Sequence, residues 1–150
     1  MTRRPRNARI STRTLRAVLR LNAANSLVCG LALAVFASTL ADRLGTGYPG
    51  WVRLVGLGLL PFAAFVWWVA AGPPERLRHE VPLIVAGDIA WVVASVVGLA
   101  LGWFDGIGVA IVIAMAVVVD TFATFQWLGV RGLGDEAATN EGATPAALLR

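Results

Sequence analysis

The chain has 150 residues, of which 57% are hydrophobic and only 15% are charged, and its formal net charge is +4 at pH 7. A soluble domain of this size carries less apolar surface, so the composition excludes an ordinary soluble fold and favours one membrane-embedded domain. The pI of about 11.0 does not predict nucleic-acid binding, because seven of the arginines lie before residue 21, directly ahead of the first apolar run.

Residues 1–20 form a basic arm at the start of the chain. Ser11 is placed to cap a helix that continues through Arg20 and lies against anionic lipid headgroups. A cleaved signal peptide or a twin-arginine signal is the alternative interpretation. The length of the arm and the lack of a small-x-small cleavage site after Leu40 disfavour it.

Four apolar runs follow the arm, at residues 21–40, 51–71, 82–103 and 107–130. Each has the roughly 20 residues that an α-helix needs to cross a hydrocarbon core about 30 Å thick. Breaks rich in glycine and proline separate the runs. The sequence therefore predicts an all-α membrane protein, a four-helix antiparallel bundle over residues 21–130, followed by a disordered tail at 131–150.

The arginines outside the arm predict the orientation of this bundle in the membrane. Those of the second loop and the tail are Arg76, Arg78, Arg131 and Arg150, whereas the opposite side has only Arg43 and Arg53. Because basic loops stay in the cytoplasm, we expect both ends of the chain to be cytoplasmic. All basic residues are arginine, which is typical of a GC-rich bacterial gene, so the expected location is a bacterial inner (plasma) membrane.

Small residues recur at helical spacing within the runs, where they allow helices to approach closely. The third run has the longest such ridge: Ala86, Ala90, Ala94, Gly98 and Gly102. The first run repeats the pattern around Gly30. We therefore expect a closely packed bundle that either forms a homo-oligomer or joins a larger membrane complex.

Two aspartates lie within the apolar runs and are the candidate functional residues. Asp88 and Asp120 are each sixteen residues from Phe104, at the turn between the last two runs, so both are expected at the same depth. A carboxylate in hydrocarbon is costly, and we expect both to face the bundle interior. Their expected hydrogen-bonding neighbours are Asn22, Asn25, Ser26 and Thr124, and the expected ion-pair partner is Arg20.

No enzyme, cofactor or metal site is predicted, because the single Cys29 and the single His79 stand in none of the known catalytic or ligand motifs. The sequence favours a non-enzymatic bundle that self-associates or serves a membrane complex. The alternative is a proton- or cation-coupled carrier of a small solute that uses Asp88 and Asp120. A third hypothesis is that the arginine arm docks on anionic lipid or on a partner.

Two stretches resemble patterns in small four-helix bacterial membrane proteins to which no activity is assigned. They run from Leu21 to Leu27, with Gly30 close behind, and from Asp88 to Ser95. In size and number of spans the chain is also similar to small multidrug resistance transporters. Those carry a membrane-embedded glutamate in the first helix, whereas this chain has Asn22 and Asn25 there.

Overall fold

The computed structural model describes the backbone of residues 10–142 and the side chains of residues 10–133. The described residues form five helices: α1 (Thr12–Val35), α2 (Ala37–Leu44), α3 (Pro49–Ala71), α4 (Pro74–Ala100) and α5 (Gly106–Gly142). Four of these, α1, α3, α4 and α5, are long and apolar enough to cross a membrane. The predicted all-α bundle with four spans is confirmed.

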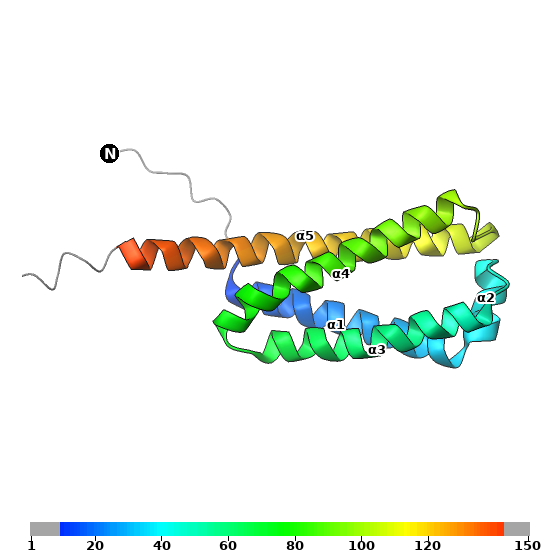
Figure 1. Cartoon of the computed structure of the whole chain (residues 1–150), viewed down its shortest axis with the longest axis horizontal. Helices are drawn as coiled ribbons and strands as arrows, with labels where there is room; N and C mark the ends of the chain where they lie inside the picture. The colour runs from blue at the N-terminus through cyan, green and yellow to red at the C-terminus, as the bar shows by residue number, and fades with distance from the viewer. Residues whose placement is uncertain (1–9, 143–150) are drawn as a thin grey trace, which may run out of the picture.

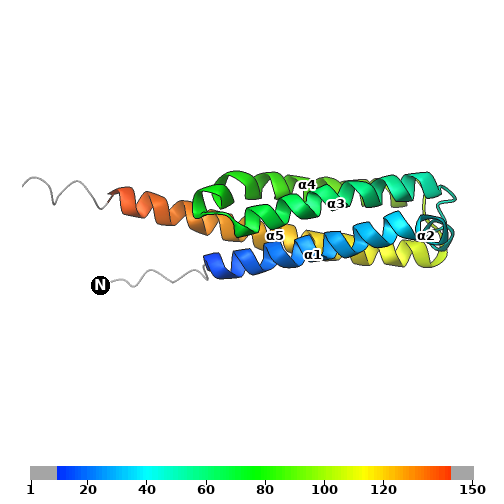
Figure 2. The ribbon, with the colours of Figure 1, turned by 90° about the horizontal axis from the view of Figure 1, so that it is seen from below.

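The four long helices lie side by side along one direction (Figures 1 and 2). Helix α1 packs chiefly against α3, and α4 packs chiefly against α5, while smaller contacts join α1 to α5 and α3 to α4. The short helix α2 lies at one end of the bundle, which we call the α2 end. Helix α1 begins and α5 finishes at the opposite end, the terminal end (Figure 1).

Helix α1 begins earlier and ends earlier than the predicted run at 21–40. The side chain of Ser11 accepts a hydrogen bond from the backbone N–H of Thr14 at 3.1 Å, so the predicted cap is confirmed. The helix breaks at Phe36, and α2 starts directly afterwards. This break lets α2 bury Ala37 and Ala41 while its charged residues remain exposed, which suits an amphipathic helix at a membrane surface.

The connection between α3 and α4 is shorter than the predicted loop, because α4 starts at Pro74 rather than at residue 82. Proline fits the first turn of a helix, where its missing N–H has no intrahelical partner. Two arginines bond the last carbonyls of α3: Arg16 donates to Ala70 at 2.7 Å and Arg76 to Trp68 at 3.4 Å. These contacts tie the terminal ends of α1, α3 and α4 together.

Helix α5 runs beyond the predicted boundary at residue 130 and continues to Gly142. The predicted disordered tail at 131–150 therefore begins as helix, and its residues 143–150 lie outside the described part of the chain. Residues 1–9 of the predicted arm also lie outside it. The sequence of α5 changes from apolar to polar near Arg131, and Gly132 and Gly134 do not end the helix there.

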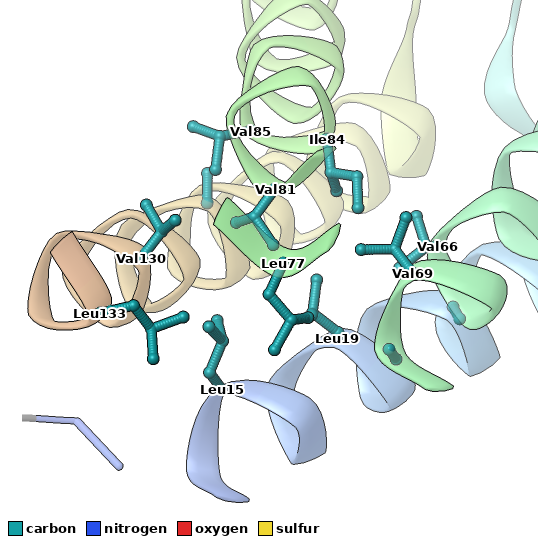
Figure 3. Close-up of a cluster of buried hydrophobic side chains, with 13 residues drawn as sticks. Leu15, Leu19, Val66, Val69, Leu77, Val81, Ile84, Val85, Val130 and Leu133 are labelled. Carbon is teal, nitrogen blue, oxygen red and sulfur yellow. The ribbon is translucent and has the colours of Figure 1, made fainter. Parts of the chain in front are cut away.

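An apolar cluster lies toward the terminal end of the bundle, and Figure 3 shows its side chains. All four long helices contribute to it, and its largest fully buried members are Leu15, Leu19, Val66, Val69, Leu77, Val81 and Ile84. Figure 3 shows these side chains pointing toward one another between the helices. Such burial contributes about 25 cal/mol per Å² of apolar surface, and the cluster adjoins the buried polar residues Asn22 and Gln126.

Glycines of α1 and α3 allow these two helices to approach each other closely. A Cβ on Gly56 would lie 2.5 Å from the backbone N of Ala34, and one on Gly30 would lie 3.0 Å from the carbonyl oxygen of Gly56. The predicted role of Gly30 in helix packing therefore has a physical basis in the α1–α3 contact. Leu33 completes this tight contact.

The predicted small-residue ridge of α4 is not a contact inside the bundle. Ala90 and Ala94 are exposed, and Gly102 lies in the turn after the helix, with positive φ and open space around it. Only Gly98 is buried, where a Cβ would lie 2.8 Å from the ring of Phe104. Within the bundle the prediction was wrong for Ala90, Ala94 and Gly102, because the buried face of α4 is formed by other residues, among them Val81, Ile84 and Ser95.

Candidate functional site

Asp88 is a buried carboxylate near the middle of α4, with only 3% of its surface exposed. Its Oδ2 atom accepts two hydrogen bonds, one from Asn22 Nδ2 at 2.8 Å and one from Gln126 Nε2 at 3.3 Å. The donors lie on α1 and α5, so three of the long helices meet at this carboxylate. Both donors are neutral amides, which solvate the carboxyl group without cancelling a negative charge.

Asn22 is held in position by its own helix. The Ser26 hydroxyl, one turn farther along α1, donates to Asn22 Oδ1 at 3.4 Å. This bond occupies the amide oxygen and leaves the Nδ2 group to donate toward Asp88. Asn22 and Ser26 are both buried, at 1% and 6% exposure. The three residues form a chain of donors that ends on the carboxylate.

Gln126 is fully buried and brings an unpaired acceptor to the same place. Its Nε2 group donates to Asp88, but its Oε1 atom has no hydrogen-bond partner among the described residues. A buried carbonyl without a donor costs about 1–3 kcal/mol. The region around Asp88 therefore has a surplus of oxygen acceptors over donors.

A cleft of about 270 Å³ lies beside Asp88 and is partly open to the outside of the bundle. All four long helices line it. Asn25, Ser26 and Asp88 supply its polar part, and its walls include Phe62, Trp91 and Met115. The lining combines apolar walls with a few polar groups, as the linings of small-molecule sites do. The aromatic walls also favour a positively charged group.

Asn25 lies at the edge of the cleft and is half-buried. Its Oδ1 atom accepts a long, weak bond from the Cys29 thiol at 3.9 Å. Asn25 thus lies beside Asp88 in the cleft without sharing the bonds of Asn22. The structure brings Asp88, Asn22, Asn25 and Ser26 together.

Asp120 and Thr124 do not belong to this site, because both are exposed on the outside of α5. The buried face of α5 is formed by Val119, Ala123 and Gln126, and each residue turns a helix by about 100°, so Asp120 lies about 100° away from Val119. The prediction that both aspartates face the interior was wrong for Asp120. Equal depth does not place two residues on facing sides of their helices.

Arg20 is exposed. The Asp88 carboxylate, which was expected to pair with Arg20, accepts hydrogen bonds from Asn22 and Gln126 instead. Arg20 lies two residues before Asn22, so its Cα is rotated by about 200° from that residue on the helix. The predicted role as ion-pair partner of Asp88 is therefore replaced by neutral amide donors.

Gln126 was not predicted from the sequence as part of the site. In an antiparallel pair, side chains tilt toward the N-terminus of their own helix, so Asp88 on α4 and Gln126 on α5 tilt toward each other. The long Gln126 side chain spans the remaining difference in depth. Its only signal in the sequence is its place in the series Val119, Ala123, Gln126, Val130, where every other member is apolar.

Comparison of the chain with protein-family models, with curated proteins and with solved structures gives no match.

Proposed function

We propose that this chain is a multi-pass membrane protein that binds a small organic cation at Asp88 and exchanges it for a proton, as a carrier does. One observation carries the proposal: a buried carboxylate with neutral partners lines a cleft that all four long helices form. Ionisable groups within membrane spans are costly and commonly mark pathways for ions or protons.

The size and walls of the cleft favour an organic cation over a bare metal ion. Its volume of about 270 Å³ far exceeds that of one dehydrated metal ion, and Phe62 and Trp91 are poor ligands for one. An ammonium group bears N–H donors that suit the Asp88 carboxylate, which lines the cleft. The substrate class is therefore a small amine with an apolar or aromatic body.

Exchange for a proton follows from the chemistry of the same residues. When Asp88 carries a proton, its O–H group is a hydrogen-bond donor. A rotation of the Gln126 side-chain amide that exchanges Nε2 and Oε1 then places Oε1 to accept from this O–H group. The carboxyl group then has a partner in both charge states. Cation and proton compete for one carboxylate, so release of one favours uptake of the other.

We further infer that the terminal end of the bundle faces the cytoplasm of a bacterial cell. The described arginines of this end include Arg13, Arg16, Arg76 and Arg78, and those of the α2 end are Arg43 and Arg53. The excess on the terminal side supports this orientation.

The test uses the full chain in lipid nanodiscs, with benzylammonium as the probe and benzyl alcohol as its uncharged counterpart. Asp88→Asn keeps the size of the side chain and one oxygen that can accept hydrogen bonds from the neighbouring amides, but it removes the charge. We expect wild type to bind benzylammonium and to bind benzyl alcohol at least about tenfold more weakly, and Asp88→Asn to lose this preference. The matched control, Asp120→Asn, makes the same change outside the cleft and should bind as wild type does.

Equal binding by wild type and Asp88→Asn would contradict the proposal. The result would then favour a bundle without a ligand, in which Asn22, Asp88 and Gln126 act only to fix the register of three helices.

A further inference from the structure

A second feature of the molecule lies on the outside of α5. Six exposed residues follow one another there at alternating spacings of three and four: Ala110, Ile113, Val117, Asp120, Thr124 and Trp127. This spacing aligns side chains along one line of a helix, as in helices that pack in left-handed pairs. We call this line the α5 seam.

Asp120 lies near the middle of the membrane span of α5. It is fourteen residues from Gly106 at one end and eleven from Arg131 at the other, or about 21 Å and about 17 Å at helical rise. Among the charged residues of residues 10–133, it alone is exposed near the middle of a span. A carboxyl group facing lipid at this depth is unfavourable, so this surface requires a polar partner.

Helix α5 is also the least covered of the four spans. In the most apolar stretch of α5, only 17% of the residues are buried inside the bundle, compared with 28% in each of the other three spans. It therefore has more free surface for another helix than its neighbours do. The small Ala110 toward the α2 end permits close approach of a second backbone.

We propose that the α5 seam packs against the α5 seam of a second copy of this chain, with the two-fold axis along the membrane normal. Copies inserted in the same orientation place the same residues at the same depth, so a two-fold seam sets Asp120 opposite the partner's Asp120. A protonated carboxyl group donates one hydrogen bond and accepts another, and two of them satisfy each other.

Thr124 strengthens the case for a second copy. It is exposed and lies one turn from Asp120 on the seam, so its hydroxyl adds a hydrogen-bond donor to the same surface. The neighbouring Thr121 lies off the seam and bonds its own helix, donating to Val117 O at 2.7 Å. The seam thus contains both acceptor and donor groups, which makes it complementary to itself.

Disulfide crosslinking in native membranes tests this interface. The native Cys29 is first replaced by serine, and single cysteines are then introduced as Val117→Cys and Val118→Cys. These neighbouring valines are alike in type and depth and are both exposed, at 61% and 39%, but they lie about 100° apart around the helix. We expect at least about tenfold more crosslinked dimer from Val117→Cys than from Val118→Cys, because only Val117 lies on the seam.

Equal yields from both positions, no dimer from Val117→Cys, or a crosslink from Val117→Cys to a different protein would each overturn the proposal. A crosslink to a different protein would identify a partner that pairs with Asp120 in place of the second copy.

Variants of Asp120 test the carboxyl pair without any crosslink. Asparagine also donates and accepts, so Asp120→Asn should keep dimer formation within about twofold of wild type, whereas Asp120→Leu should weaken it about tenfold. Association is measured by energy transfer between labelled copies at increasing lipid dilution. Undiminished association of Asp120→Leu would show that Asp120 does not hold the copies together. Neither Asp120 variant changes a residue that lines the cleft, so their outcome is independent of cation binding at Asp88.

Discussion

Asn22 and Asp88 are joined by a hydrogen bond of 2.8 Å that crosses the centre of the bundle. Helices α1 and α4, which carry them, pack mainly on other partners, α1 on α3 and α4 on α5. The bond therefore links the two helix pairs to each other. It also fixes the orientation of the carboxylate that lines the cleft.

Asn22→Ala should destabilise the bundle by about 1–3 kcal/mol, because it leaves Asp88 with a single amide donor in a buried place. The loss is measured by reversible unfolding in mixed micelles. Asn25→Ala is the matched control, since Asn25 is half-buried and bonds only the Cys29 thiol. An equal loss in both variants would show that the bond to Asp88 has no special weight.

Cation binding should weaken as the pH falls, because a proton and an ammonium group compete for the Asp88 carboxylate. The groups that face Asp88 are uncharged: Asn22 and Ser26 on α1, Phe62 on α3, and Met115 and Gln126 on α5. The pH dependence should thus come from Asp88 alone. Benzylammonium affinity is measured between acidic and neutral pH, and a dependence that persists in Asp88→Asn would contradict this assignment.

Gln126→Glu places a second carboxyl group beside Asp88. Two carboxylates at this distance repel each other unless they share one proton. The variant should therefore be less stable than wild type at neutral pH and should regain stability as the pH is lowered. Gln126→Leu, which removes both the donor and the unpaired oxygen, should show no such recovery. Unfolding at several pH values distinguishes the two.

Much of the fold follows from the sequence, because the length of the apolar runs determines the four spans. The break at Phe36 does not follow, since Phe36 and the residues around it are compatible with a continuous helix. What ends α1 there is the packing of Ala37 and Ala41 against the end of the bundle. Packing of this kind depends on residues distant in the sequence.

The candidate site was predictable only in part. Asn22, Ser26 and Asp88 could be grouped because they are polar residues at similar depth. Helix α5 is apolar on nearly all sides, so its sequence does not show which face is buried. Counting residues from the turn at Phe104 gave the depth of Asp120. It could not show on which side of α5 Asp120 lies, and it did not identify Gln126.

The α1–α3 contact is tested by two glycines of the same helix. A Cβ at Gly56 would press on the backbone of α1, whereas a Cβ at Gly58 meets nothing within 4 Å. Gly56→Ala should destabilise the protein by about 1–3 kcal/mol. Gly58→Ala should be neutral or stabilise it slightly, by up to about 1 kcal/mol, since alanine favours helix. Equal effects would mean that α1 and α3 do not approach closely at Gly56.

Photolabelling with a benzylammonium that carries a diazirine shows where on the protein a cation binds, and so whether it binds beside Asp88 within the cleft. After irradiation in nanodiscs, mass spectrometry identifies the labelled residues. We expect labels on the cleft walls, at Phe62, Trp91 or Met115, and their loss in Asp88→Asn. Labelling confined to lipid-facing residues such as Trp67 and Trp68, or unchanged in Asp88→Asn, would contradict cation binding beside Asp88.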